Sequence, residues 1–236
     1  CALPISTAVR KGEVKVAGRA FPPGAGLVPE AAREPLRHAF ADLNLARFRT
    51  QREETMEYHQ IVKLKDGSEC VLRNGTEQDS KAVLDVFVLT HEQTDYLLTY
   101  PDENALSAEQ EAAFLKARHE SGNEITILAE VNGTVVGLAG IGAIGKQEKI
   151  RHRADLGVSV DARYWHLGIG KALLGACIAC AGNAGYDQLE LTVVADNRVA
   201  IALYEKAGFT EFGRNPRGFK SRKGTYQEVV SMRLEL

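Results

Sequence analysis

Residues 164–173 read YWHLGIGKAL, and this short stretch decides how the rest of the chain is interpreted. Gly168 and Gly170 stand two apart, which removes Cβ atoms where a backbone must approach a ligand closely. An apolar helical pattern follows over Gly168–Gly182. The first turn of such a helix offers free N–H groups and the positive end of its dipole. The stretch therefore predicts an anion site that suits a pyrophosphate, with a glycine-bearing tight turn before a helix as the alternative.

Two other phosphate-binding motifs fit the sequence less well. A Walker A loop needs glycine where Trp165 stands and serine or threonine where Ala172 stands, so residues 164–173 are not such a loop. The segment Gly140–Gly145 matches G-x-G-x-x-G, but the charged Lys146–Arg153 that follows gives no apolar helix. We interpret these glycines instead as small residues on a strand, beside a ligand or a tight bend of the sheet.

The bulk composition is that of an ordinary globular protein and excludes several classes of partner. The 236 residues are 44% hydrophobic and 25% charged, with a net charge of −2. No strongly basic field exists to attract nucleic acid or an anionic membrane surface. The longest apolar stretches, Val135–Gly145 and Ala172–Gly182, are too short to span a bilayer. We therefore expect neither nucleic acid nor membrane as a partner.

Cysteine usage bears on metal binding and on the cellular compartment. Cys177 and Cys180 form a CxxC inside an apolar helical pattern, and no second CxxC or histidine pair completes a metal site. We interpret both as small buried helix residues rather than a redox pair, and we expect no metal. A reducing cytoplasm fits this use of cysteine.

The first residues have an unusual composition. Ser6–Thr55 is rich in proline, glycine, alanine and arginine without a stable period, and we predict that residues 1–55 are an extension outside the folded domain. As a hypothesis, Cys1–Ser6 is the translation of a common sequencing-adapter string, and Arg52–Thr55 that of a ribosome-binding site. Met56 would then begin the natural protein, and residues 56–236 form one domain; a genuine flexible extension is the alternative.

The remaining chain predicts a mixed α/β sheet with helices on its faces. Turn signals at Asp66-Gly67 and Asn132-Gly133 indicate two hairpins, and Ser107–Gln110 is a capping box. The order of elements is β-β-α-α-β-β-β-α-β-α-β-β, which combines strand pairs with a βαβ unit. The predicted strands are Val62–Leu64, Cys70–Arg73, Ile125–Val131, Thr134–Ile144, Asp155–Val160, Leu189–Val194, Phe209–Arg214 and Gln227–Leu234, and the helices begin at Thr76, Ser107, Gly168 and Arg198.

A second motif gives the sequence a family resemblance. Residues 193–209, VVADNRVAIALYEKAGF, resemble the strand–N-x-x-A-x-x-x-Y-x-K-x-G-F block of the GNAT superfamily of acetyltransferases. The loop before Gly168 resembles the pyrophosphate loop of that family, R/Q-x-x-G-x-G/A, although Trp165 occupies the Arg/Gln position. The resemblance covers about Ile61–Leu236. It implies a mostly antiparallel sheet that splays between two strands, and acetyl-coenzyme A as co-substrate.

The resemblance also implies where acetyl-CoA binds. The strand before the glycine loop would pair with the pantetheine arm through its backbone and offer an N–H to the thioester oxygen. Asn197 would hydrogen-bond the arm, and its alternative is a plain helix N-cap. The expected cofactor-binding residues are Leu156, Val158, Val160, Trp165, His166, Leu167, Gly168, Ile169, Gly170, Lys171, Asn197 and Tyr204.

By the same resemblance Tyr204 is the expected general acid, since a phenol can donate to the departing CoA thiolate. The alternative is a core tyrosine, because Ala200, Leu203 and Tyr204 share one helix face. The acceptor amine must lose a proton, and Asp155 and Glu190, on the two strands of the splayed pair, are the candidate bases. His152 is a weaker candidate.

The acceptor is less well specified by the sequence. The stretch Thr90–Ser107 would cover it, and Glu92, Asp95 and Tyr96 suit a cationic amine of a small molecule or peptide. The basic Arg214–Lys223, predicted as a loop between the last strands, could favour an acidic acceptor, meet CoA phosphates or be merely solvated. The expected activity is N-acetyl transfer by direct attack in a ternary complex, in a monomer or homodimer. The alternative is a GNAT-like module that senses acyl-CoA without turnover.

Overall fold

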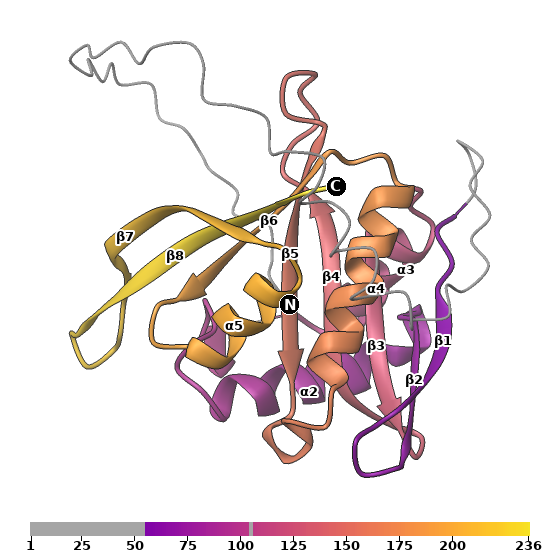
Figure 1. Ribbon diagram of the computed structural model, residues 1–236. Coiled ribbons are helices and arrows are strands. Elements are labelled where there is room, and N and C mark those ends of the chain that lie inside the picture. Colours follow the sequence, from indigo (N-terminus) through magenta and orange to yellow (C-terminus); the bar gives the residue numbers. More distant parts are fainter. Residues whose placement is uncertain (1–54, 104–105) are drawn as a thin grey trace. The chain divides into compact units, whose positions relative to one another are not determined.

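A computed structural model describes residues 55–103 and 106–236 (Figure 1). The predicted extension, residues 1–55, lies outside the described residues apart from Thr55. The described core begins at Met56, which is buried and whose backbone N–H donates to the Ser121 carbonyl at 3.1 Å. The Asn74 side chain donates to the Met56 carbonyl at 2.7 Å. The chain is therefore anchored in the fold from Met56 onward.

The elements follow the predicted order. The strands are β1 (His59–Lys63), β2 (Glu69–Asn74), β3 (Ile125–Val131), β4 (Thr134–Ala143), β5 (Arg153–Val160), β6 (Gln188–Val194), β7 (Thr210–Lys220) and β8 (Tyr226–Glu235). The helices are α2 (Ser80–Glu92), α3 (Ala108–His119), α4 (Ile169–Asn183) and α5 (Arg198–Lys206), with short 3-10 turns at Glu77–Asp79, Pro101–Glu103 and Ala162–Tyr164.

The strands form one mixed sheet of eight, in the order β1-β2-β3-β4-β5-β6-β8-β7. All neighbouring strands are antiparallel except β5 and β6, which are parallel. The parallel pair is the βαβ unit of the sequence, because α4 is the crossover between its strands. The predicted fold class is confirmed.

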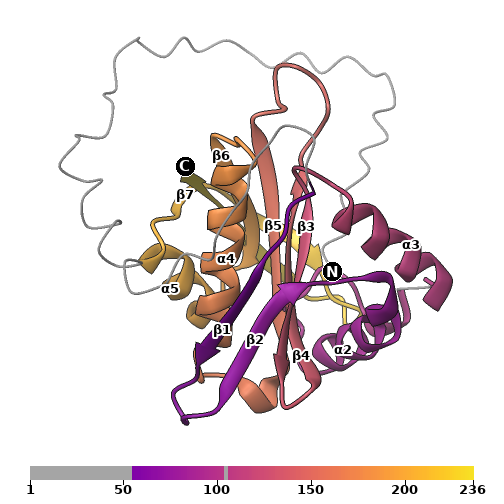
Figure 2. The same ribbon diagram turned by 90° about the vertical axis from the view of Figure 1, so that its right-hand side faces the viewer.

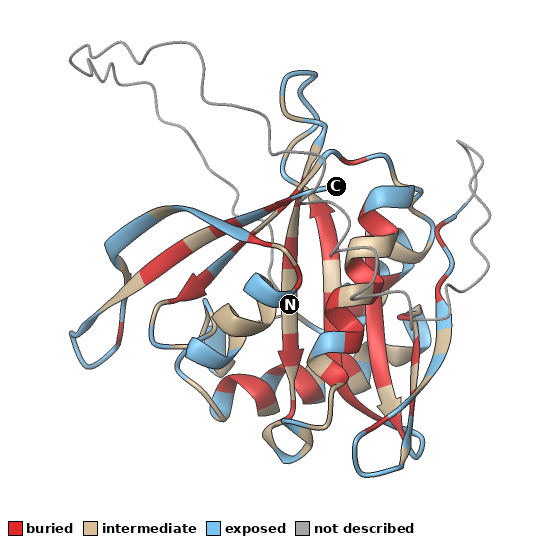
Figure 3. Ribbon diagram, in the orientation of Figure 1, coloured by how far each residue is buried: buried red, intermediate tan, exposed pale blue. Residues whose placement is uncertain are grey.

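Helices cover both faces of the sheet (Figure 2). On one face α4 packs across β3, β4 and β5, and on the other α2 and α3 pack against β4 and β3. Both layers are apolar where they meet the sheet: Leu173 and Cys177 of α4 are fully buried, and Val83, Val86 and Leu115 pack with Leu128 on the opposite face. The buried residues accordingly concentrate in α4 and the central strands (Figure 3).

Local sequence signals formed the turns and caps as expected. Asn132 and Gly133 have φ values of 51° and 77°, the left-handed pair that a tight two-residue hairpin turn requires. Ser107 Oγ accepts from the Gln110 N–H at 3.3 Å, and the Ser107 N–H donates to Gln110 Oε1 at 2.8 Å, which completes the predicted capping box.

The prediction of a loop over Arg214–Lys223 is wrong as far as Lys220. Strand β7 continues to that residue, and Phe219 and Lys220 pair with Gln227 and Tyr226 of β8. The physical reason is that β7 is the outermost strand, so its charged side chains can face solvent on both sides. Its Pro216 lies between Asn215 and Phe219, where the strand register shifts, and a shift in an outer strand tolerates a missing N–H.

Candidate active site

The glycine loop joins β5 to α4 and ends at the N-terminus of that helix. Gly168 is the N-cap of α4 and has φ of +106°, a left-handed conformation that favours glycine. The Ala172 N–H donates to the Gly168 carbonyl at 3.0 Å, which is the first turn of the helix. The N–H groups of Ile169, Gly170 and Lys171 precede that bond, as the orphan donors of a helix start do. The predicted anion site therefore has its donors on the α4 N-terminus.

Trp165, which replaces the family's Arg/Gln, is tied to the end of β5. Its indole Nε1–H donates to the Val160 carbonyl at 2.7 Å, while the residue as a whole stays 45% exposed. The next residue, His166, has φ of +65°, a conformation rare for a residue other than glycine. The indole hydrogen bond and the two left-handed residues fix the loop without using the N–H groups at the helix start.

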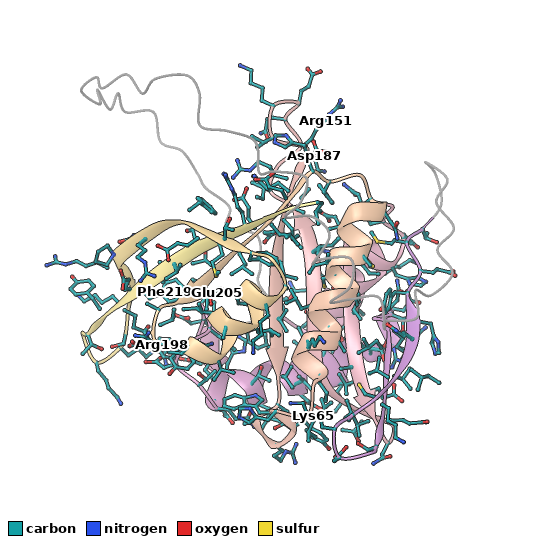
Figure 4. All side chains as sticks on the ribbon, in the orientation of Figure 1. Lys65, Arg151, Asp187, Arg198, Glu205 and Phe219 are labelled. Atoms are coloured by element: carbon teal, nitrogen blue, oxygen red, sulfur yellow. The ribbon has the colours of Figure 1, made fainter. Side chains whose placement is uncertain are left out.

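Lys65 also belongs to this loop and was not among the predicted site residues. Its backbone N–H donates to the Leu167 carbonyl at 3.1 Å, so the β1–β2 turn braces the loop from the side. In Figure 4, Lys65 lies at the same end of the sheet as the start of α4. Nothing in the local sequence could have signalled this, because the contact spans a hundred residues of chain.

The sheet parts between β5 and β6, beginning just beyond Asp155. The described strands pair only at Arg153–Gln188, Ala154–Leu189 and Asp155–Glu190, although β5 runs on to Val160 and β6 to Val194. The predicted splay is thus present, and Figure 1 shows the two strands separating toward the α4 N-terminus.

The backbone of β5 faces this gap at alternate residues. The Asp161 N–H donates to the Val136 carbonyl of the β4 side at 2.9 Å. Because successive residues alternate in an antiparallel ladder, the N–H groups of Val160, Val158 and Leu156 point the other way, toward β6. The gap therefore has free backbone donors on one wall at Val158 and Val160, whereas the Leu156 N–H lies at the last ladder pair, Asp155–Glu190, and is the donor that this pairing uses.

Tyr204 lies on α5, half-buried between that helix and α4. Its ring packs against Phe209 at 5.8 Å, tilted by 55°. Burial raises the pKa of Tyr204 to about 12, with a smaller contribution from the neighbouring Cys177. The hydroxyl therefore stays protonated at neutral pH. A free thiol has a pKa of about 8.5, so complete proton transfer from this phenol to a thiolate is unfavourable, and hydrogen-bond donation is the better role.

Asn197 caps α5, as its alternative interpretation predicted. Its side-chain oxygen accepts from the Ala200 N–H at 3.2 Å. A side-chain amide has further hydrogen-bonding capacity, so the cap does not exclude a contact with a ligand.

The two predicted bases differ in their surroundings. Glu190 is held by Arg153 through two hydrogen bonds of 2.5 and 2.8 Å. Burial raises the pKa of the Asp155 carboxyl above its usual value, and the charge of Arg118 offsets part of that rise. His152 is exposed before β5, and its carbonyl accepts from Asp187. Of the three, Asp155 is the one that combines burial with a raised pKa, which is the pattern expected of a general base.

The predicted acceptor residues lie at the last residue of α2 and just beyond it. Glu92, Asp95 and Tyr96 are exposed, and the Asp95 carbonyl accepts from the Gln227 side chain at 2.9 Å. Between them, Gln93 contacts the end of β5: it accepts from the Ala162 N–H at 2.7 Å and donates to Asp161 Oδ1 at 2.9 Å. The α2 end is therefore fixed to the glycine-loop side of β5, a contact that sequence reasoning missed.

Other acidic and aromatic residues of the same stretch are already engaged. Arg222, in the β7–β8 turn, lies 4.1 Å from the Tyr100 ring centroid, and its guanidinium donates to both Asp102 oxygens at 2.7 and 2.9 Å. The Arg222 N–H donates to the Tyr100 hydroxyl at 3.0 Å. These acidic and basic segments bind each other, so fewer of their charged groups are free to bind a charged acceptor.

The cysteines are buried as expected. Cys177 and Cys180 are fully buried within α4, and burial raises the pKa of Cys177 and brings that of Cys180 to about 12. Both are therefore protonated thiols. Over residues 55–103 and 106–236 no group of histidine, cysteine and carboxylate residues could hold a metal ion. None of the helices in these residues has the length and apolar character needed to cross a membrane.

A sheet that opens beside a glycine loop at a helix N-terminus defines an α/β domain of the acetyltransferase class. The chain belongs to the acetyltransferase (GNAT) family, whose model matches residues 87–209. That match contains both motifs, the glycine loop and the block around Tyr204. The resemblance seen in the sequence is therefore confirmed.

Individual relatives agree with this family. The L-amino acid N-acetyltransferase AaaT of Escherichia coli (strain K12) is 34% identical over 107 residues, which are 45% of this chain and 65% of that protein. The chain thus spans about two thirds of the length of this relative. A GNAT-family acetyltransferase structure from Streptococcus pneumoniae matches with a TM-score of 0.68 and 30% identity, over 71% of this chain and 99% of that one. A putative acetyltransferase from Salmonella typhimurium, solved with its cofactor acetyl-CoA, shares the fold at 22% identity and a TM-score of 0.64, covering 71% and 94%.

Proposed function

We propose that the protein transfers an acetyl group from acetyl-CoA to a primary amine of a small molecule or peptide. The observation that carries this proposal is the gap between β5 and β6, which ends at the orphan N–H groups of the α4 N-terminus. An extended arm attached to a pyrophosphate matches that combination of an open strand and an anion site. The name of the E. coli relative and the acetyl-CoA in the Salmonella structure support the same activity.

In this proposal the chain binds acetyl-CoA largely through its backbone. The donors at Ile169, Gly170 and Lys171 hold the pyrophosphate. The β5 residue Val158 pairs with the pantetheine arm, and its N–H donates to the thioester oxygen as negative charge develops there. The Val160 carbonyl already accepts from Trp165, so the pantetheine arm pairs with β5 on the N-terminal side of that carbonyl.

The chemistry is a single displacement at the thioester carbon. The free amine attacks that carbon, the C–N bond forms, and the C–S bond breaks with the electron pair leaving on sulfur. Tyr204 donates a hydrogen bond to the departing thiolate. Asp155, directly or through water, takes the proton that the amine loses. Glu190 is less suited to this role because Arg153 holds it.

Asp155→Asn tests the base. A carboxyl whose pKa is raised stays protonated to a higher pH, so kcat/KM of the wild type should fall as pH drops through that raised pKa. The asparagine variant should lose on the order of 10² in kcat/KM at neutral pH and lack this acidic limb. Glu190→Gln is the comparison variant and should keep the limb. A pH–rate profile measures both, and an unchanged limb in Asp155→Asn would assign the proton to another group.

One experiment distinguishes the proposed transferase from the alternative function, a sensor that binds acyl-CoA without turnover. Thiol release from acetyl-CoA is followed with a panel of amino acids, polyamines and peptides, and mass spectrometry identifies the acetylated product. Amine-dependent thiol release establishes the transferase. Tight acetyl-CoA binding with no release above the buffer rate for any amine would favour the sensor.

We also propose a cellular compartment and an oligomeric state. Cys70, Cys177 and Cys180 are all free thiols among the described residues, which supports a reducing compartment such as the cytoplasm. A homodimer is a prediction that sedimentation or scattering can decide.

A further inference from the structure

The segment Gln93–Glu103, which we call the strap, follows α2 and links two separate parts of the sheet. At its start the Gln93 side chain forms hydrogen bonds of 2.7 and 2.9 Å with the two residues that follow β5. Two positions later, the Asp95 carbonyl accepts from the Gln227 side chain of β8 at 2.9 Å. The strap therefore runs from the β5 side to the β8 side.

Both contacts lie at the open end of the gap between β5 and β6. On one side, the strap binds just beyond Val160, the last residue of β5. On the other side β6 ends at Val194, and the N–H that follows it donates to the Glu228 carbonyl at 2.9 Å, next to Gln227. One residue separates the two strap residues that make these contacts, so at most about 7 Å of chain lies between them. The strap thus crosses the open end of the gap directly.

The Gln93 end of the strap is fixed by buried groups. Asp161 is only 1% exposed, and its carboxylate accepts from the Gln93 amide, from the Arg163 N–H at 3.0 Å and from the Arg163 guanidinium at 2.6 and 2.8 Å. The Asp161 N–H also donates to the Val136 carbonyl of β4 at 2.9 Å. Salt screens buried groups much less than exposed ones, so we expect this end to stay in place as ionic strength changes.

The other end of the strap is held by exposed groups. The Arg222 guanidinium donates to both Asp102 oxygens at 2.7 and 2.9 Å and lies 4.1 Å from the Tyr100 ring centroid. The Arg222 N–H donates to the Tyr100 hydroxyl at 3.0 Å. Because the side chains of Arg222 and Asp102 are 52% and 67% exposed, salt weakens their attraction. One end of the strap is therefore fixed, and the other can be released.

We propose that Gln93 and Arg222 are positioning residues for the acceptor amine, which act by holding the strap across the open end of the gap. The proposal rests on the proposed function, because the thioester lies in this gap only if the protein binds acetyl-CoA there. Gln93 fixes the strap to β5, whose Val158 N–H faces the thioester, and so sets the direction from which the amine attacks. Arg222 holds the far end closed around the bound amine, and its release admits the amine and frees the product. Loss of the Gln93 contact should therefore lower kcat, and loss of the Arg222 contact should raise KM for the amine.

Arg222→Gln tests the releasable end, with the most active amine of the thiol-release panel as the substrate. KM for this amine should rise about fivefold to tenfold, while kcat and acetyl-CoA affinity change little. An increase in NaCl from about 0.05 to 0.5 M should raise the wild-type KM toward that of the variant and leave the variant's KM nearly constant. Lys223→Gln removes an exposed charge from the same turn and should keep both the wild-type KM and its salt dependence. Arg222→Asp combined with Asp102→Arg reverses the ion pair and should largely restore KM.

Gln93→Met tests the fixed end, because it keeps the length of the side chain and removes both hydrogen bonds. We expect kcat to fall by about tenfold or more with little change in acetyl-CoA affinity, since a misplaced amine reaches the thioester carbon less often in a reactive geometry. Gln78→Met makes the same change at an exposed position before α2 and should behave as wild type.

An unchanged amine KM in Arg222→Gln, or a kcat for Gln93→Met within about twofold of wild type, would overturn the proposal while the transferase activity stood. Amide hydrogen exchange over the strap measures the Arg222 contact without turnover, and it should be faster in Arg222→Gln than in Lys223→Gln. If no amine were acetylated, the proposed function would fail by itself. Exchange would then decide about the strap, since faster exchange in Arg222→Gln supports a strap held by this residue and equal rates overturn it.

Discussion

Gly170→Glu should reduce acetyl-CoA affinity by a factor of 10² or more. The substitution places a carboxylate in the first turn of α4, where the proposed pyrophosphate binds. Two unit charges about 5 Å apart repel by about 3 kcal/mol at an effective dielectric constant of 20. The helix itself should tolerate the change. A Cβ at this position would meet only Leu203, at an ordinary 3.6 Å, and an acidic residue near a helix N-terminus is favourable to the helix.

Three variants separate charge from shape in this experiment. Gly170→Gln has nearly the same size without the charge and should lose much less affinity. Gly168→Glu should reduce the affinity at least as much, but it adds backbone strain because Gly168 has φ of +106°. Gly182→Glu, an exposed position in the last turn of the same helix with open space around it, should bind normally. Calorimetry measures the affinities, and near wild-type binding by folded Gly170→Glu would remove the loop from the cofactor site.

Tyr204→Phe should lower kcat by on the order of 10² to 10³ while acetyl-CoA affinity changes little. The ring keeps its contact with Phe209, so only the hydroxyl is lost. That hydroxyl donates to a sulfur whose negative charge exists only as the C–S bond breaks, and a group that acts in the transition state affects kcat. The loss should shrink with an acyl donor whose thiol is a better leaving group.

The alternative for Tyr204 predicts a different pattern. If the residue only fills the core, the phenylalanine variant should show a small change in unfolding free energy and nearly normal turnover. Tyr226→Phe, which removes an exposed phenol hydroxyl from β8, is the matched control and should behave as wild type. A kcat for Tyr204→Phe within about threefold of wild type, at saturating substrates, would take the hydroxyl out of the mechanism.

Sequence signals that act over a few residues gave correct predictions. Asn132-Gly133 formed its turn, Ser107 and Gln110 their reciprocal cap, and Gly168 the left-handed start of α4. Each depends on the conformational preference of one or two residues, which does not change with the surroundings.

Contacts between distant segments could not be predicted in the same way. Arg118 meets Ile141 across 23 positions, and Gln93 meets Ala162 across 69. An arginine on a helix has the same local pattern whether it points to solvent or toward the sheet, so nothing in the sequence singles out Arg118. Trp165 is a related case, since its role depends on the position of the Val160 carbonyl. The extra length of β7 depends on its place at the side of the sheet.

The parting of β5 from β6 also has a mechanical consequence. In the part of the chain that the structure describes, three residue pairs join β5 to β6, so strands β1–β5 and strands β6–β8 form two sub-sheets that are hydrogen-bonded to each other at one end. Each sub-sheet therefore has an edge with unpaired backbone N–H and C=O groups, to which another strand could bind. In most proteins such edges lie at the outside of a sheet. Here the unpaired edges of β5 and β6 lie within the sheet, and α4 and α5 are close enough to restrict access to them. A narrow ligand with its own amide groups can form hydrogen bonds in the gap between β5 and β6, whereas a β-strand from a second molecule would have to pass the helices.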